Sequence, residues 1–310
     1  MQRSLNKPVK RIFIILSLIF ILSIITFPAA VFAKSDVAPD NEQSNSYAIV
    51  IGISNYPGHG SIIDNPAGLD LFYANDDALL VQHVLLKNYG LKQSNITLLV
   101  NYAATRNNIL KAINDIKAKA SESDKVLFYY SGHSLLANEM GIPEESDTVG
   151  LIVRGDEDPQ SLDFISDDEL AAAFSDFNTN QIAFIFDSCS SGAFLEELVG
   201  PGRVVISATG PDANDVSGEY GRHYDVFGLG SLPELGWVNH GFFTYFFFSV
   251  GIQGNEAIDF DEDGIISLEE VFYSVAQPWC MYITSVASDM GFDQLNEIPD
   301  IIDLNGDFDL

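Results

Sequence analysis

Short apolar runs recur along this chain, and each is followed by a segment with helical spacing. The first run, residues 47–53, carries no charged side chain, which is typical of a strand covered on both faces. Similar runs predict strands at residues 96–100, 126–130, 182–186 and 204–207. Because strands that alternate with helices form parallel sheets, this order predicts an α/β fold with helices on both faces of the sheet.

Polar residues mark the starts of three of the intervening helices. Asn75 is expected to cap a helix that runs to about Asn88, and Thr105 is expected to cap the next one. Ser166 is expected to cap a third helix, with Glu169 three positions later completing a capping box. At 310 residues, of which 47% are hydrophobic, the chain is long enough to bury the core of one large domain.

The N-terminal segment has the layout of a secretory signal peptide. Basic residues precede an apolar run at residues 12–27, and small residues follow as far as Ala33, after which we expect cleavage. This run is shorter than the ~20 residues of a membrane span, and an uncleaved N-terminal anchor is the alternative. We therefore divide the chain into a signal peptide at 1–33, a flexible leader at 34–46 and one domain at 47–310, and expect a secreted or extracytoplasmic protein.

The chain is strongly acidic. It has 44 Asp and Glu residues against 15 Lys and Arg, which gives a formal net charge of −29. Such a surface repels nucleic acid and anionic membranes and attracts cations. We therefore expect no nucleic-acid partner and no membrane contact beyond the N-terminal segment. For most of the acidic residues, the simplest interpretation is that they keep the protein soluble.

Residues with catalytic potential stand at the C-terminal ends of two predicted strands. His133 follows the strand at 126–130, and Cys189 follows the strand at 182–186. Ligands of open α/β sheets bind at this edge, and consecutive strands usually lie side by side, so the two side chains are expected to share one cleft. A thiol beside an imidazole can act as nucleophile and general acid/base. A lone Cys or His in such a place is more often structural, but the pair is a more specific signal.

Only one other cysteine, Cys280, is present, so the two could in principle form a disulfide. The surroundings of Cys189 argue against that pairing, and we expect Cys280 to be a core residue. Gly192 follows the cysteine turn, and a short helix at 193–198 is expected to start there. A helix N-terminus near Cys189 would favour its thiolate form.

Five sequence motifs follow one another along the chain, at residues 47–56, 75–78, 127–133, 184–192 and 241–245. The third ends in Ser-Gly-His, and the fourth has an acid two residues before its Cys and a Gly three residues after it. Together they resemble the caspase-like cysteine peptidases of the legumain, caspase and metacaspase type, known as clan CD. The resemblance implies the caspase–haemoglobinase fold, a three-layer α/β/α sandwich around a mostly parallel sheet.

The same resemblance implies a cysteine endopeptidase that acts on peptide or protein substrates without an organic cofactor. Cys189 would be the nucleophile and His133 the general acid/base, while the backbone N–H groups of Cys189 and Ser134 would form the oxyanion hole. Many relatives have Gly where this chain has Ser134. Asp187 would line the pocket for a basic substrate residue, because a carboxylate pairs well with Arg or Lys. A purely structural Asp187 and a legumain-like preference for Asn are the alternatives.

An acid-rich segment, residues 259–270, fits the twelve-residue EF-hand loop. Side-chain oxygens stand at positions 1, 3, 5, 9 and 12, with Gly at position 6 and an apolar residue at position 8. This pattern predicts a structural or activating calcium site, whose ligands would be Asp259, Asp261, Asp263, Ile265, Ser267 and Glu270. A helix is expected after the loop, at residues 268–282. The segment before the loop is a poorer helix candidate, because Gly251 and Gly254 interrupt it.

Two other functions fit the sequence. A transpeptidase on the same scaffold would pass the acyl group to an amine instead of water. An inactive, calcium-dependent surface binding module is the rival from another class. The presence of both His133 and Cys189 argues against the binding module, whereas Ser134 in place of Gly argues slightly for it.

Overall fold

The computed structural model describes most of the chain from residue 44 onward. The described residues are 44–57, 70–137, 148–158, 161–212, 219–220, 238–289, 298–304 and 308–310. They belong to one compact unit, Gln43–Leu310. The expected signal peptide and most of the expected leader lie outside the described residues. No helix among the described residues is long and apolar enough to cross a membrane.

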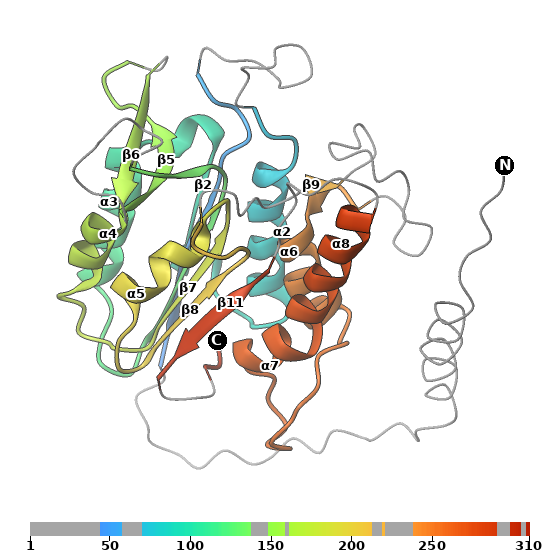
Figure 1. The fold of residues 1–310 in the computed structure, drawn as a ribbon. Coiled ribbons are helices and arrows are strands. Elements are labelled where there is room, and N and C mark those ends of the chain that lie inside the picture. The colour runs from blue at the N-terminus through green and yellow to red at the C-terminus, as the bar shows by residue number, and fades with distance from the viewer. Residues whose placement is uncertain are drawn as a thin grey trace, which may run out of the picture. The chain divides into compact units, whose positions relative to one another are not determined.

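Six strands form the central sheet, in the order β11-β8-β7-β3-β1-β2 (Figure 1). They are β1 (Ser46–Gly52), β2 (Ile96–Val100), β3 (Lys125–Ser131), β7 (Ile182–Asp187), β8 (Arg203–Ser207) and β11 (Asp300–Asp303). Neighbouring strands run parallel, except that β11 pairs antiparallel with β8. The predicted α/β fold with a mostly parallel sheet is confirmed. Each of the five predicted strands is present, with ends within one residue of those expected.

Alternate residues of each central strand face opposite sides of the sheet. In β3, Leu127 and Tyr129 belong to one apolar core, whereas Phe128 and Tyr130 belong to the other. All four side chains are fully buried. Because helices cover both faces, the middle residues of the central strands are apolar on both sides and do not alternate with polar residues.

Helices cover both faces of the sheet (Figure 1). One face carries α3 (Arg106–Lys117), α4 (Asp167–Phe174) and α5 (Leu195–Leu198). The other face carries α2 (Ala74–Lys87), α6 (Phe242–Thr244), α7 (Leu268–Val271) and α8 (Gln277–Asp289). The π-helical segment η4 (Tyr245–Gln253) continues α6. A second one, η5 (Phe272–Ala276), joins α7 to α8. Short 3₁₀ turns are η1 (Gln93–Asn95), η2 (Asn101–Ala103) and η3 (Ser191–Phe194).

Two of the three predicted helix caps are confirmed. Thr105 Oγ1 accepts a hydrogen bond from the Asn108 N–H at 3.3 Å, and Ser166 Oγ accepts one from the Glu169 N–H at 3.1 Å. The Glu169 carboxylate does not complete a capping box, because it is bound to Arg106 on α3. The expected local bond is thus replaced by a contact between two helices.

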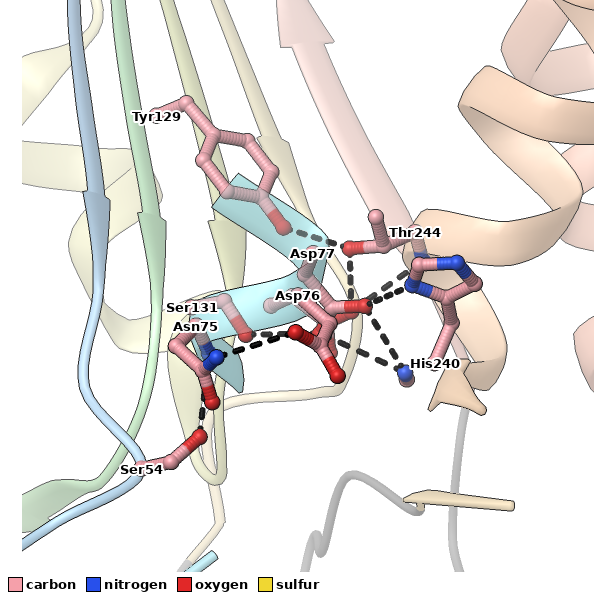
Figure 2. A network of polar contacts seen from close by, with 10 residues as sticks. Ser54, Asn75, Asp76, Asp77, Tyr129, Ser131, His240 and Thr244 are labelled. Atoms are coloured by element: carbon pink, nitrogen blue, oxygen red, sulfur yellow. Dashed lines mark hydrogen bonds and ion pairs between the residues drawn. The ribbon is translucent and has the colours of Figure 1, made fainter. Parts of the chain in front are cut away.

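The cap predicted at Asn75 is wrong. Helix α2 begins two residues earlier than a cap at Asn75 implies, since its N-cap is Tyr73, which makes no side-chain cap hydrogen bond, and its first residue is Ala74. Ser54, on the loop after β1, supplies the acceptor instead, since its Oγ binds the Asn75 N–H at 3.0 Å. The Asn75 side chain donates to Asp76 Oδ1 at 2.9 Å (Figure 2). A tertiary contact therefore sets the start of the helix.

Two smaller sheets were not predicted. The first is antiparallel and contains β4 (Ser134–Leu136), β5 (Val149–Arg154) and β6 (Leu162–Ser166). The second pairs β9 (Glu219–Tyr220) with β10 (His240–Gly241). Strand β4 starts directly after His133, and β10 leads directly into α6. Both small sheets therefore fix segments next to the carboxyl edge of the central sheet.

Candidate active site

His133 and Cys189 leave the central sheet from neighbouring strands. Ser131, the last residue of β3, is paired in parallel register with Asp187, the last residue of β7. His133 and Cys189 each lie two residues beyond this pair, at the carboxyl edge where α/β proteins bind ligands. Both residues are partly exposed. The structure thus brings the two predicted catalytic residues to one place on the edge, within reach of solvent.

The loop that carries Cys189 is tightly held. Ser190 has a left-handed backbone, with φ of 51°. Ser191 exchanges hydrogen bonds with Thr209, from the Ser191 N–H to Thr209 Oγ1 at 3.0 Å and from the Thr209 N–H to Ser191 Oγ at 3.2 Å. Thr209 Oγ1 also donates to the Ser188 carbonyl at 3.1 Å. The segment after β8 therefore fixes the turn on both sides of Cys189.

Cys189 and Cys280 are not joined by a disulfide, as predicted. Cys280 is fully buried on α8 and belongs to the apolar core on that face. After Cys189, the chain forms the 3₁₀ turn η3 from Ser191 and then the four-residue helix α5. The helix expected at 193–198 is thus present only in its second half, since its first turn is 3₁₀.

Ser134 begins β4. Residues of an antiparallel strand alternate in whether their N–H faces the partner strand. The Ile152 N–H binds the His133 carbonyl at 2.9 Å, so the Ser134 N–H faces away from β5. The Ser134 hydroxyl is hydrogen-bonded to Ser188 Oγ at 2.9 Å and to the Cys189 carbonyl. Where many relatives have Gly, this chain thus has a side chain that ties the histidine loop to the cysteine loop.

Asp187 is buried, with 4% of its surface exposed. Its Oδ2 accepts hydrogen bonds from the Thr244 N–H at 3.1 Å and from Thr244 Oγ1 at 2.5 Å. Thr244 Oγ1 also lies 2.6 Å from the Tyr129 hydroxyl (Figure 2). The carboxylate therefore holds the helix that starts at Phe242 against β7, which is the structural role left open by the sequence. Its role in a substrate pocket stays a prediction.

A second buried carboxylate, Asp77, lies at the same edge. Its Oδ1 is 2.9 Å from His240 Nδ1, and its Oδ2 accepts the Ser131 hydroxyl at 2.9 Å (Figure 2). The Gly241 N–H donates to both oxygens, at 3.1 and 3.3 Å. Asp77 and His240 are separated by 163 residues, and no local pattern in the sequence predicted the pair. The sequence signal for Asp77 was the acid-rich segment at residues 75–78, which belongs to the family resemblance.

Gly241 separates the two buried carboxylates. A Cβ atom at this position would lie 2.5 Å from Asp187 Oδ2 and 3.1 Å from Asp77 Oδ2, so a larger residue would collide with a carboxylate. Asp76 adds a third acid beside them. Burial raises the pKa of Asp76, and the Asp77 charge raises it further, whereas His240 lowers it. Acidic side chains therefore gather at this edge of the sheet, and His240 is the charge partner of Asp77 when it is protonated.

His133 contacts two tyrosines that the sequence reasoning missed. Its N–H donates to the Tyr56 hydroxyl at 2.8 Å, and its carbonyl accepts the Tyr130 hydroxyl at 2.6 Å. The Tyr56 ring lies against the imidazole, with ring centroids 4.8 Å apart. Both tyrosines belong to the segments that carried the family resemblance, which was the only signal for them in the sequence.

The predicted calcium loop brings its acidic residues together. One oxygen atom from each of Asp259, Asp261 and Asp263 lies within 4.8 Å of the others. Asp259 Oδ2 accepts the Gly264 N–H at 2.9 Å, whereas Asp259 Oδ1 is buried without a hydrogen-bond partner. Gly264 has φ of 88°, a left-handed conformation that suits Gly. An oxygen left without a partner beside other carboxylates is what a cation would satisfy, so these residues fit the ion.

The last two predicted ligands cap the helix that follows the loop. Ser267 Oγ accepts the Glu270 N–H at 3.2 Å, and the Glu270 carboxylate accepts the Ser267 N–H at 3.0 Å and the Phe260 N–H at 2.5 Å. Ile265, whose carbonyl was the sixth predicted ligand, is exposed on the same loop. The helix after the loop is present and continues through α8 to Asp289. Before the loop, α6 and η4 are helical over residues 242–253 despite Gly251, but the helix ends before Gly254 and does not lead directly into the loop.

Comparisons with known proteins relate part of this chain to one family. Residues 47–198 match the family model of the metacaspase, peptidase C14 domain. Metacaspase-8 of Arabidopsis thaliana is 27% identical over 159 residues, which cover 49% of this chain and 38% of that protein. The chain thus matches about two fifths of the length of this curated relative. A crystal structure of a protein from Geobacter sulfurreducens is similar with a TM-score of 0.45 and 16% identity, over 68% of this chain and 83% of that one.

The matched segment contains β1, β3 and β7 and therefore both predicted catalytic residues, His133 and Cys189. It begins at the first strand and ends with α5, just after the cysteine loop. The ordered motifs, the mostly parallel sheet and the family match relate residues 47–198 of this chain to the metacaspase domain of the caspase-like proteins.

Proposed function

We propose that this protein is a cysteine endopeptidase with Cys189 as nucleophile and His133 as general acid/base. The observation that carries the proposal is the register of Ser131 with Asp187, because it puts the two residues at the same level of neighbouring strands. Both side chains are partly exposed, so a peptide could reach them. The metacaspase domain supports the class of reaction.

The proposed reaction is acyl transfer in two steps. The Cys189 thiolate attacks the carbonyl carbon of the substrate. The new oxyanion accepts hydrogen bonds from the backbone N–H groups of Cys189 and Ser134. Protonated His133 gives its proton to the leaving amine, which completes the thioester. Neutral His133 then takes a proton from water, and the hydroxide releases the acid from Cys189. The direction of the Ser134 N–H, away from β5, supports its place in this step.

We propose a preference for Arg or Lys before the cut. Three acidic side chains, Asp76, Asp77 and Asp187, gather at the edge beside Cys189, and the whole protein has a net charge of −29. Such a site attracts a cationic side chain and repels an acidic one. Asp187 is the residue proposed to line the pocket, in addition to holding Thr244. A preference for Asn remains the alternative, since a carboxylate also accepts hydrogen bonds from an amide.

We also propose that the chain is exported and that its loop at 259–270 binds calcium. The N-terminal sequence supports export to an extracytoplasmic place, where calcium is available. The grouped oxygens of Asp259, Asp261 and Asp263 and the buried Oδ1 of Asp259 support the ion. Ser267 and Glu270 would complete its shell, together with the Ile265 carbonyl. The ion would stabilise the folded loop, and the proposed chemistry at Cys189 does not pass through it.

A positional-scanning peptide library tests the reaction and its specificity together. We expect cleavage after Arg or Lys, complete loss of cleavage in Cys189→Ala, and nearly complete loss in His133→Ala. Near wild-type turnover in Cys189→Ala would refute the cysteine-peptidase proposal, and dominant cleavage after Asp or Glu would refute the basic preference.

Two further measurements separate the other candidate functions. An added amine nucleophile that appears in the product would indicate a transpeptidase. A thiol-directed covalent probe that fails to label Cys189 in the folded protein, with or without calcium, would favour the inactive binding module.

A further inference from the structure

We propose that Tyr56 is a positioning residue for His133, acting together with Tyr130. This inference rests on the proposed function, because it concerns how the general acid/base is held. The two tyrosines come from different strands. Tyr56 follows β1, and Tyr130 is the penultimate residue of β3. Both are buried, with 4% and 0% of their surfaces exposed.

The two hydroxyls hold the backbone of His133 from both ends. The Tyr56 hydroxyl accepts the His133 N–H at 2.8 Å, and the Tyr130 hydroxyl donates to the His133 carbonyl at 2.6 Å. The Tyr130 hydroxyl also lies 2.9 Å from the Ile152 carbonyl, which joins β5 to the same cluster. Burial, followed by the nearby Tyr56 and Cys189, raises the pKa of Tyr130, so its hydroxyl stays protonated and acts as a donor.

Gly132 lets the two hydroxyls approach this closely. A Cβ atom on Gly132 would lie 2.6 Å from the Tyr130 hydroxyl and 2.7 Å from the Tyr56 hydroxyl. Real Cβ atoms do not approach oxygen so closely, so any larger residue would push the tyrosines or the loop aside. The Gly before His133 is thus explained by the space that the tyrosine pair occupies.

Tyr56 also touches the reactive group itself. Its ring centroid lies 4.8 Å from that of the His133 imidazole, with a tilt of 48° between the planes. The ring therefore limits the rotation of the imidazole on one side, while the hydroxyl fixes the backbone that carries it. Catalysis depends on such placement, since a displacement of ~1 Å can reduce the rate by about a hundredfold.

The loop that presents Tyr56 is itself fixed by several segments. The Tyr56 N–H donates to Asp70 Oδ1 at 2.7 Å, and the Asn55 carbonyl accepts a guanidinium N–H of Arg154 at 3.0 Å. The Asn101 side-chain oxygen accepts the N–H groups of Ser54 and Asn55, at 2.8 and 3.0 Å. A loop held this firmly can transmit the position of β1 to His133.

The test compares two variants of Tyr56. Tyr56→Phe keeps the ring and removes the hydroxyl, and we expect kcat to fall about fivefold, the effect of one neutral hydrogen bond. Tyr56→Leu removes the ring as well, and we expect kcat to fall about a hundredfold, with KM within about twofold of the wild type. Gly132→Ala should resemble Tyr56→Leu. Tyr89→Phe and Tyr89→Leu serve as matched controls, because Tyr89 is a partly buried tyrosine beyond the distal end of α2.

A second readout does not depend on any peptide substrate. The rate at which iodoacetamide alkylates Cys189 is measured against pH, with His133→Ala as reference, since the rate reports the thiolate. We expect the profile of Tyr56→Leu to move toward that of His133→Ala, and the profile of Tyr56→Phe to stay between it and the wild type. An unchanged profile in Tyr56→Leu overturns the inference whatever the peptidase assay gives, as does a kcat within twofold of the wild type in an active enzyme. The wild type could cleave no peptide while the alkylation profile of Tyr56→Leu still differs from that of the wild type. This result would support the positioning role and refute only the peptidase proposal.

Discussion

Asp187 and Thr244 are joined by two hydrogen bonds to a single carboxylate oxygen, although they are 57 residues apart. The bonds connect the end of β7, two residues before Cys189, to the start of the helix that runs to Gln253. The neighbouring Tyr129 hydroxyl, 2.6 Å from Thr244 Oγ1, closes the cluster. The cysteine strand and the C-terminal helices are therefore held together directly behind the proposed nucleophile.

Replacing Thr244 by Val should destabilise the fold without changing substrate preference. The variant leaves a buried carboxylate with one donor fewer, which costs about 1–3 kcal/mol in the free energy of unfolding. Urea denaturation measures this loss. The control is Thr179→Val, which removes a buried hydroxyl that donates to the Asp124 carbonyl and accepts the Gln181 N–H at 3.0 Å. Both partners are neutral, so this variant should cost less. Equal losses in the two variants would contradict the special role of Asp187.

Replacing Asp187 by Asn separates its structural role from its proposed role in the pocket. If Asp187 lines the pocket, cleavage after Arg should fall far more in Asp187→Asn than in Thr244→Val, even where both lose the same stability. Peptide assays are run at a temperature at which both variants are folded. Equal activity losses in the two variants would leave Asp187 as a structural residue.

Replacing Cys280 by Ala should leave peptidase activity and probe labelling unchanged. Cys280 is fully buried on α8 and is not bonded to Cys189, so the variant creates only a small cavity. We expect a loss of about 1 kcal/mol in stability. Intact mass and kcat measurements check this. Loss of activity in Cys280→Ala would mean that the cysteines pair after all, if the untreated wild-type protein also has a mass two hydrogens below that of its reduced form.

Calcium should raise the melting temperature of the protein. An ion that binds only the folded state stabilises it by about 2.7 kcal/mol at a concentration of 100 times its Kd. Asp259→Ala and Glu270→Gln should remove most of the gain, because they alter the first and last positions of the loop. Scanning calorimetry with calcium or with a chelator measures the shift.

Glu262→Gln is the matched control for the calcium loop. Glu262 lies in the same loop and its replacement removes the same charge, but it stands at position 4, which supplies no ligand in the EF-hand pattern. This variant should keep nearly the full response to calcium. If neither calcium nor a chelator changes the melting temperature of the wild type, the calcium site at residues 259–270 is ruled out.

Asp167 should make the protein less stable as pH rises from about 4 to about 6. Burial raises the pKa of this carboxyl from 3.8 to about 6 in the folded state, despite hydrogen bonds from the Asp168 and Val149 N–H groups that lower it. The folded state thus binds the proton more tightly than the unfolded state does. The stabilisation is complete below pH 4 and is lost as pH rises through 6.

Denaturation of wild type and Asp167→Asn between pH 4 and 8 tests this. The variant cannot ionise, so its stability relative to the wild type should increase across that window and then level off. Asp176→Asn, at an exposed position after the same helix, is the control. A difference between Asp167→Asn and wild type that does not change with pH would contradict the raised pKa.

The sequence alone predicted five strands of the sheet and the positions of the two residues proposed to be catalytic. Residues 47–53 and 126–130 are apolar at every position, which occurs when a strand is covered on both faces. His133 and Cys189 follow such strands directly, so their place at the carboxyl edge needed no knowledge of the fold. The acid-rich loop at 259–270 was equally local, because twelve consecutive residues contain its whole pattern.

Contacts between distant segments were decided only by the tertiary structure. Asp77 meets His240 across 163 residues, and Tyr56 meets His133 across 77. No local pattern specifies such pairs, because each depends on how the strands are ordered in the sheet. The start of α2 lies two residues before the predicted one for the same reason, since Ser54 supplies an acceptor there. Local periodicity therefore determined where the elements and the reactive residues lie, whereas the packing of the sheet determined what holds those residues in place.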